Sequence, residues 1–179
     1  MESLFLVGYK GSQKNIIGQM LSARLSCELI DVTKLVEESE KQDSIDIIES
    51  RGEDYYERIT EYNIKNIPHK DNVVLIGDTN ISDNEFIREM KKYGKFIYLK
   101  AEPETLYKNI IENDEKVISN NNELTIDNVR EGLHKNKLFY EKLANTIIEI
   151  DNKKITNIFK EVLGYYNMIT KLICHIFIK

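Results

Sequence analysis

The stretch Leu4-Phe5-Leu6-Val7-Gly8-Tyr9-Lys10-Gly11-Ser12-Gln13-Lys14-Asn15-Ile16-Ile17-Gly18 decides the fold of this chain. Four apolar residues run into a glycine, a second glycine follows three positions later, and Lys14 opens an amphipathic run. This order predicts a strand, a glycine loop and a helix. The backbone N–H groups of such a loop and the N-terminus of the following helix attract phosphate, and a lysine reaches the terminal phosphates. The stretch therefore predicts a nucleotide phosphate site with Lys14 as its lysine.

The loop departs from the usual G-x-x-x-x-G-K-[ST] pattern at two positions. Gln13 replaces the second glycine and Asn15 replaces the Mg²⁺-binding hydroxyl. If Gln13 takes a positive φ, this costs roughly 1–2 kcal/mol, which a folded domain can absorb, and we expect its side chain to crowd the phosphate cradle. Asn15 still offers a carbonyl oxygen to Mg²⁺. The predicted nucleotide-binding residues are Gly8, Gly11, Ser12, Gln13, Lys14 and Asn15. The alternative is an ordinary strand-turn-helix in which the glycines only make the turn.

Composition indicates one soluble globular domain of 179 residues, of which 41% are apolar. The net charge of −5 argues against nucleic acid as a general partner. Cys27 and Cys174 show no metal-ligand spacing, which favours a reduced, cytoplasmic protein. No apolar run approaches the roughly 20 residues of a membrane span, and the first strand begins too early for a signal peptide. We expect no membrane contact, and a monomer or weak homodimer.

Strands and helices alternate along the chain. Apolar runs predict strands at 4–7, 28–31, 71–78, 95–99 and 146–150, and helical spacing predicts helices at 16–25, 34–50, 54–67, 85–93, 102–112, 126–144 and 155–165. This alternation predicts a three-layer α/β fold with a five-stranded parallel sheet. We expect one domain over residues 1–165, with a lid segment at about 113–125. An apolar extension, whose spacing suits a helix, follows at 166–179.

Six segments carry a resemblance to a known family. They are Gly8–Lys14, Leu29–Thr33, Gly52–Tyr56, Val73–Gly77, Ile97–Leu99 and Leu138–Tyr140. In this order they resemble shikimate kinase, a family with the nucleoside-monophosphate-kinase-like P-loop fold, over roughly residues 4–163. The resemblance implies the strand order 2-3-1-4-5, ATP and Mg²⁺ as cofactors, and phosphoryl transfer to a small hydroxylated metabolite.

Two ATP-side positions of the family are retained. The resemblance places the phosphate lysine at Lys14 and the first carboxylate of the family's D-x-D motif, linked to Mg²⁺, at Asp31. Asn15 and Asp31 are therefore the expected metal ligands, and Lys14 and Asp31 the expected catalytic residues on this side.

The substrate-side positions have changed. The second carboxylate of D-x-D is Thr33, and the two arginines that grip the substrate carboxylate fall on Glu57 and Asn136. Replacing those arginines would remove about 3–6 kcal/mol of substrate binding. This corresponds to roughly a 10²–10⁴-fold loss of affinity. The family's glycine-rich substrate loop is Gly77-Asp78-Thr79, and its lid arginine falls near Lys116.

Asp78 is a possible replacement for the carboxylate lost at Thr33. It follows an apolar strand, so its carboxylate should emerge in the same crevice as Asp31 and serve as a second Mg²⁺ anchor or a general base. The alternative is that Asp78 only caps the next turn.

Two functional interpretations follow. The first is an ATP-dependent small-molecule kinase of the shikimate kinase type, using Lys14, Asp31 and Mg²⁺. The second is a catalytically silent relative that serves as a nucleotide-binding or protein-interaction module.

Overall fold

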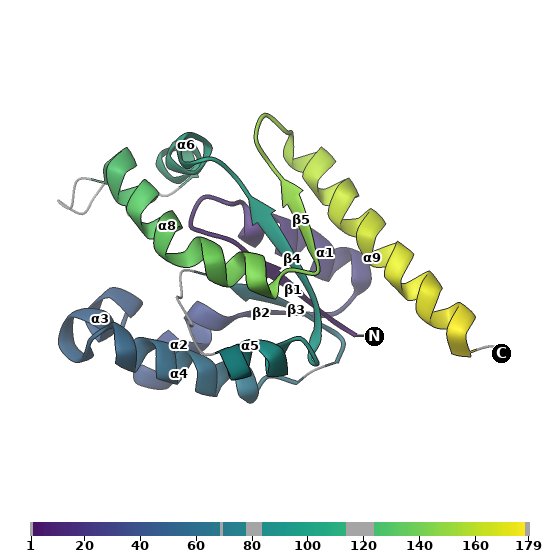
Figure 1. Ribbon diagram of the computed structural model, residues 1–179, viewed down its shortest axis with the longest axis horizontal. Coiled ribbons are helices and arrows are strands. Elements are labelled where there is room, and N and C mark those ends of the chain that lie inside the picture. Colours follow the sequence, from purple (N-terminus) through teal and green to yellow (C-terminus); the bar gives the residue numbers. More distant parts are fainter. Residues whose placement is uncertain (1, 69, 78–83, 114–123, 178–179) are drawn as a thin grey trace.

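The computed structural model describes residues 2–68, 70–77, 84–113 and 124–177, and its centre is one parallel sheet (Figure 1). The sheet has five strands in the order β2-β3-β1-β4-β5. The strands are β1 (Ser3–Val7), β2 (Glu28–Asp31), β3 (Asn72–Ile76), β4 (Gly94–Lys100) and β5 (Thr146–Glu149). The predicted parallel sheet and its strand order are confirmed.

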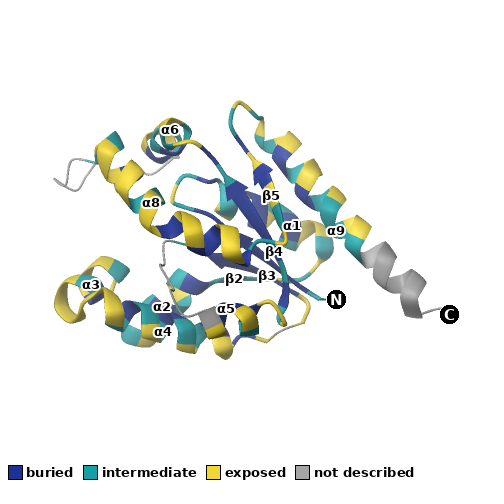
Figure 2. Cartoon of the chain, viewed as in Figure 1, coloured by how far each residue is buried: buried dark blue, intermediate teal, exposed yellow. Residues whose placement is uncertain are grey.

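Helices cover both faces of the sheet (Figure 1). They are α1 (Lys14–Leu25), α2 (Val32–Glu40), α3 (Ser44–Arg51), α4 (Glu53–Lys65), α5 (Asn84–Met90), α6 (Pro103–Asn113), α8 (Ile126–Leu143) and α9 (Ile155–Phe177). Successive side chains of a strand point to opposite faces. Leu4 and Leu6 of β1 accordingly pack with residues of α1, α6 and α9, whereas Phe5 and Val7 pack with residues of α4, α5 and α8. Figure 2 shows the central strands buried between these layers. β1 and β3 are apolar along most of their length because both of their faces are covered.

Two helix predictions were wrong in their extent. The single helix predicted at 34–50 is two helices, because Lys41 takes a left-handed conformation (φ 55°) and ends α2. α3 restarts at Ser44, whose N–H donates to Glu37 Oε1 at 3.1 Å. The last helix was predicted to end at residue 165, but it continues to Phe177 without a break.

The strand register places three strand ends at one edge of the sheet. Val7 of β1 pairs with Ile76 of β3, and Asp31 of β2 pairs with Leu75 of β3. The carboxyl edge of an open parallel sheet is where α/β proteins bind ligands. The loop after β1 and Gly77 after β3 therefore leave the sheet side by side.

Candidate functional site

The loop between β1 and α1 needs glycine at two positions because neighbouring backbone lies close. A Cβ atom at Gly8 would stand 2.9 Å from the carbonyl oxygen of Leu99 in β4. Gly11 has a φ of 83°, and a Cβ atom there would collide with the carbonyl oxygen of Leu106 in α6. Inside the loop, the Ser12 N–H donates to the Tyr9 carbonyl at 3.0 Å. The loop is thus held tightly between β4 and α6.

Gln13 stands at the N-cap of α1 with φ 62° and ψ 13°. The left-handed conformation costs roughly 1–2 kcal/mol for a residue other than glycine. Its side chain makes no capping hydrogen bond, and the first turn of α1 contains no acidic residue. The first N–H groups of a helix have no partner within the helix, and they carry the positive end of its dipole. The N-terminus of α1 therefore offers hydrogen-bond donors to an anion.

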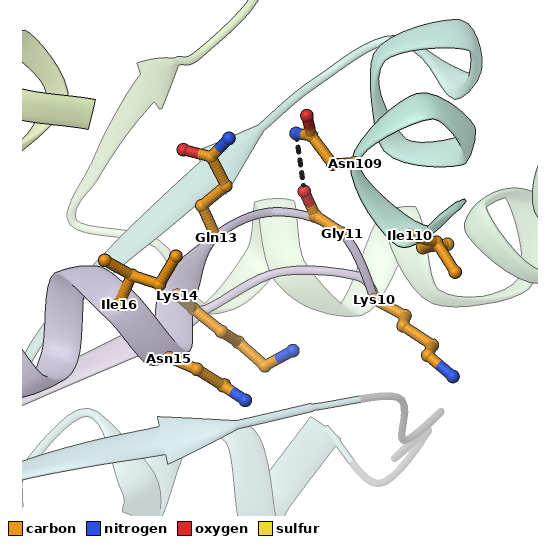
Figure 3. A pocket seen from close by; sticks show the side chains of 8 residues that line it. All are labelled: Lys10, Gly11, Gln13, Lys14, Asn15, Ile16, Asn109 and Ile110. Atoms are coloured by element: carbon orange, nitrogen blue, oxygen red, sulfur yellow. Dashed lines mark hydrogen bonds between the residues drawn. The ribbon is translucent and has the colours of Figure 1, made fainter. Parts of the chain in front are cut away.

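The side chains around the loop point to two different sides (Figure 3). Lys10, Lys14 and Asn15 extend to one side, whereas Gln13 lies on the other side, facing away from the Lys14 ammonium. All four line a pocket of about 460 Å³. Gln13 Oε1 and Ser12 Oγ are buried, and neither has a hydrogen-bond partner within the part of the chain that the structure describes.

Helix α6 forms the outer wall of this pocket. Asn109 Nδ2 donates to the carbonyl oxygen of Gly11 at 2.9 Å (Figure 3). The start of α6 is fixed from the turn after β5, where Asp151 Oδ1 accepts from the Glu102 N–H at 3.1 Å and from Thr105 Oγ1 at 2.5 Å. Sequence reasoning missed Asn109. The available signal was an amide side chain between the core positions of α6.

Lys14 reaches from the loop into the crevice between the ends of β1 and β3. A Cβ atom placed on Gly77 would lie 3.8 Å from Lys14 Nζ and 3.1 Å from Thr33 Oγ1. Tyr140 of α8 donates its hydroxyl hydrogen to the Gly77 carbonyl at 3.2 Å. The structure therefore brings together Lys14, Thr33 and Gly77, which the sequence assigned to the nucleotide and substrate sides of one site.

The two expected metal ligands line a common pocket. Asn15 and Asp31 both border a second cavity of about 310 Å³, which also contacts Lys34. Asp31 is the N-cap of α2, where its Oδ1 accepts from the Thr33 N–H at 3.1 Å. Among the described residues, no cluster of three or more His, Cys, Asp or Glu side chains could hold a metal. The pair still fits Mg²⁺, because this ion often uses one or two protein ligands together with water and substrate phosphates.

Asn136 and Glu57 occupy different environments. Asn136 is buried, and its Nδ2 donates to the carbonyl oxygen of Gly132 one turn earlier in α8, at 2.9 Å. Glu57 is partly buried in α4. Burial raises the pKa of Glu57, and the negative charges of the three acidic neighbours Asp54, Glu61 and Glu53 raise it further.

The cations next to these two residues in sequence are exposed. Arg58 is exposed on α4. Lys135 and Lys137 are exposed on α8, where each lies within 4 Å of a glutamate one turn away, at 3.4 and 3.9 Å respectively.

Some predicted site residues lie outside the described residues. They are Asp78, Thr79 and positions 114–123 of the predicted lid, which include Lys116.

None of the helices in the described ranges is long and apolar enough to cross a membrane.

A five-stranded parallel sheet of this order, a glycine loop between β1 and α1, and a lysine opening α1 define a P-loop protein. The model of the shikimate kinase family matches residues 10–167, so the chain belongs to the shikimate kinase family.

Relatives and solved structures agree over nearly the whole chain. The shikimate kinase of Persephonella marina is 29% identical over 165 residues, covering 92% of this chain and 98% of that protein. That of Sulfurihydrogenibium is 27% identical over 164 residues, covering 91% and 96%. The crystal structure of shikimate kinase from Bacteroides thetaiotaomicron has a TM-score of 0.80 at 19% identity, covering 94% and 98%. A structure of the Acinetobacter baumannii enzyme in complex with shikimate has a TM-score of 0.77 at 18% identity, covering 96% and 94%.

Proposed function

We propose that this protein is an ATP-dependent phosphotransferase that acts on a hydroxyl group of a small metabolite. The observation that carries the proposal is the position of Lys14. It opens an uncapped helix at the phosphate loop, and its ammonium extends into a crevice lined by Thr33 and Gly77. One lysine can therefore contact both a terminal phosphate and the place where an acceptor would stand.

The loop and the start of α1 would hold the phosphates of ATP. Their N–H groups donate to phosphate oxygens, and Lys14 neutralises charge on the terminal phosphates. Asn15 and Asp31 would hold Mg²⁺, which would offset the negative charge of the phosphates. The buried hydroxyl of Ser12 has no partner within the described chain, which fits a loop built to face a ligand.

The reaction transfers the γ-phosphoryl group to the acceptor. A bond forms between the acceptor oxygen and the γ-phosphorus, the bond from this phosphorus to the bridging oxygen of ADP breaks, and ADP leaves. The hydroxyl proton passes to a carboxylate, and Asp78, which lies outside the described residues, is the candidate base that the sequence offers. Holding the acceptor in line supplies much of the rate enhancement, and the nearness of Thr33 and Gly77 to Lys14 supports this role for them.

The acceptor side of the site differs from the family pattern. Glu57 and Asn136 stand at the positions that the resemblance assigns to two arginines, and the exposed lysines beside Asn136 are near glutamates on their own helix. We therefore propose a phosphotransferase with a changed preference for its acceptor. The second candidate is a nucleotide-binding relative without turnover, which the threonine at position 33 and the capping role of Asp31 favour.

The test is a calorimetric titration with ADP and ATP, with and without Mg²⁺, followed by a coupled screen of hydroxylated metabolites. The parent protein should bind ATP more tightly with Mg²⁺, and Lys14→Ala should abolish most of that binding. Lys41→Ala, in the exposed turn after α2, is the matched control and should bind normally. Absence of nucleotide binding by the parent overturns the proposal. Binding without turnover of any acceptor supports the second candidate.

A further inference from the structure

One face of α8 carries three residues that lie over the crevice. Gly132, Asn136 and Tyr140 are spaced four positions apart, so they share one side of the helix. At one end of this row, a Cβ atom on Gly132 would collide with the hydroxyl of Tyr9 in the phosphate loop. At the other end, the Tyr140 hydroxyl donates to the Gly77 carbonyl at 3.2 Å.

The middle residue of the row therefore lies between two contacts with the sheet edge. Tyr9 and Gly77 follow β1 and β3, which are neighbours in the sheet and end in register. The contacts of Gly132 and Tyr140 put Asn136 on the side of α8 that faces these strand ends. Thr33 Oγ1 and Lys14 Nζ also lie near Gly77, at 3.1 and 3.8 Å from where a Cβ atom on Gly77 would stand.

The side-chain oxygen of Asn136 is a hydrogen-bond acceptor without a partner among the described residues. The side chain is only 7% exposed, and Nδ2 donates to the Gly132 carbonyl at 2.9 Å. This bond fixes the orientation of the amide, because the reversed amide would set its oxygen against the carbonyl oxygen. Oδ1 is buried and has no partner across the described ranges of the chain. A buried acceptor without a donor destabilises a fold, and such groups in native proteins call for an explanation.

We infer that Asn136 is a specificity-determining residue whose Oδ1 accepts a hydrogen bond from an O–H or N–H group of the acceptor molecule. This rests on the proposed function of the site. A carboxylate offers acceptors only and would oppose Oδ1, so Asn136 selects an uncharged polyhydroxy or amide compound over a carboxylic acid. The exposed cations beside it, Lys135 and Lys137, lie near Glu131 and Glu141 and supply no counter-charge over the crevice.

Two probes that differ only in whether they carry a carboxylate test the inference. One is shikimate, and the other is the primary alcohol obtained by reducing the carboxylate of shikimate. Affinity is measured by calorimetry in the presence of ADP, and kcat/KM by a coupled assay with Mg·ATP. One hydrogen bond corresponds to about a tenfold change in affinity, so we expect the alcohol to be preferred by about tenfold or more.

Asn136→Leu separates a role in specificity from a structural role. It should lower kcat/KM for the alcohol about tenfold, chiefly through KM. It should also raise Tm, because the unpaired buried acceptor is gone. A residue that is merely structural would lower Tm instead. Asn136→Arg should shift the preference toward shikimate. Lys137→Ala, one position along on the exposed face, is the control and should leave the ratio of the two probes unchanged.

The inference is overturned if the parent prefers shikimate, if neither probe binds at millimolar concentration, or if Asn136→Leu leaves the probe ratio unchanged. The ADP titration of the parent distinguishes a failure of this inference from a failure of the proposed function. A parent that binds ADP but gives one of those results refutes the role of Asn136 alone. A parent that does not bind ADP refutes the proposed function.

Discussion

Tyr9 of the phosphate loop lies so close to Gly132 of α8 that a Cβ atom at residue 132 would collide with the Tyr9 hydroxyl. Tyr9 follows β1 almost directly, and Gly132 lies more than a hundred residues later in a helix that also contacts Gly77 through Tyr140. The contact couples the loop that would hold phosphate to the helix that would contact the acceptor. Glycine at this position of α8 is explained by the approach of the tyrosine ring.

Gly132→Ala should displace Tyr9 and weaken ADP binding, because the added methyl group occupies the place of the hydroxyl. Gly164→Ala in α9 is the matched control, since a Cβ atom there meets nothing within 4 Å. The control should gain roughly 1 kcal/mol of stability from the better helix propensity of alanine. Thermal unfolding and ADP calorimetry on both variants provide the measurement. Equal stabilisation of both variants, with unchanged ADP affinity, would contradict the coupling.

Replacing both unusual loop residues should tighten the binding of Mg·ATP. In the double variant Gln13→Gly with Asn15→Ser, glycine takes the observed φ of 62° without strain, and serine restores a hydroxyl to the metal. Calorimetry with Mg·ATP measures the gain, and titration without Mg²⁺ isolates the contribution of Gln13. A double variant that binds no better than the parent would mean that the loop is not a nucleotide site.

Glu57→Gln should raise Tm at neutral pH, and the gain should fade in acid. Burial and three acidic neighbours raise the pKa of Glu57 above the ordinary value of 4.5, so the folded state holds its proton more tightly than the unfolded chain. The stability that comes from the protonated form is fully present below the unfolded pKa and is lost as pH rises through the raised pKa. Glutamine mimics that protonated form at every pH.

Melting curves from acid to neutral pH test the sign of this effect. Glu104→Gln is the opposite control, because the hydrogen bond from Arg130 lowers the pKa of Glu104. That variant should lose a little stability at neutral pH. A Glu57→Gln variant that is less stable than the parent at neutral pH would show that the Glu57 carboxylate has a favourable partner.

Shikimate itself should be phosphorylated far more slowly than is usual for the family. Glu57 and Asn136 provide no positive charge for its carboxylate, and Thr33 provides no carboxylate to orient its reacting hydroxyl. The loss of two charge-assisted hydrogen bonds corresponds to about 3–6 kcal/mol. A coupled assay with millimolar shikimate and Mg·ATP measures the rate, and an established shikimate kinase serves as the positive control. Turnover within the usual enzyme range of roughly 1–10³ per second would refute this expectation.

The sheet could be predicted because its strands carry a clear signal. β1 and β3 are short, mostly apolar runs that are each followed by a glycine, and their order follows from the family resemblance. The break at Lys41 was missed because no glycine or proline marks it. The left-handed turn there is stabilised by the contact between Ser44 and Glu37, which the local pattern does not reveal.

The phosphate loop was predictable and the walls of the site were not. Gly8 and Lys14 follow the spacing of the G-x-x-x-x-G-K-[ST] pattern, so the strand-loop-helix unit could be predicted. Asn109 contacts Gly11 across 98 positions of sequence, and no local pattern reports such a pairing. The direction of the Gln13 side chain, away from Lys14, also depends on the path of the loop rather than on its residue types.

Asp151, which fixes the start of α6, is synthesised long after the loop between β1 and α1. Helix α6 borders the pocket beside that loop. β1 is the first strand to be made, yet its two neighbours in the sheet, β3 and β4, are synthesised later. The hydrogen bond from Asn109 to the Gly11 carbonyl likewise forms only after Asn109 is synthesised, and the start of α6 is fixed only after Asp151 is synthesised. Domains generally fold as units during synthesis. In a nascent chain that stops before Asp151, the start of α6 would lack its hydrogen bonds to Asp151, so this wall of the pocket would not be fixed. We therefore expect nucleotide binding to begin late in translation.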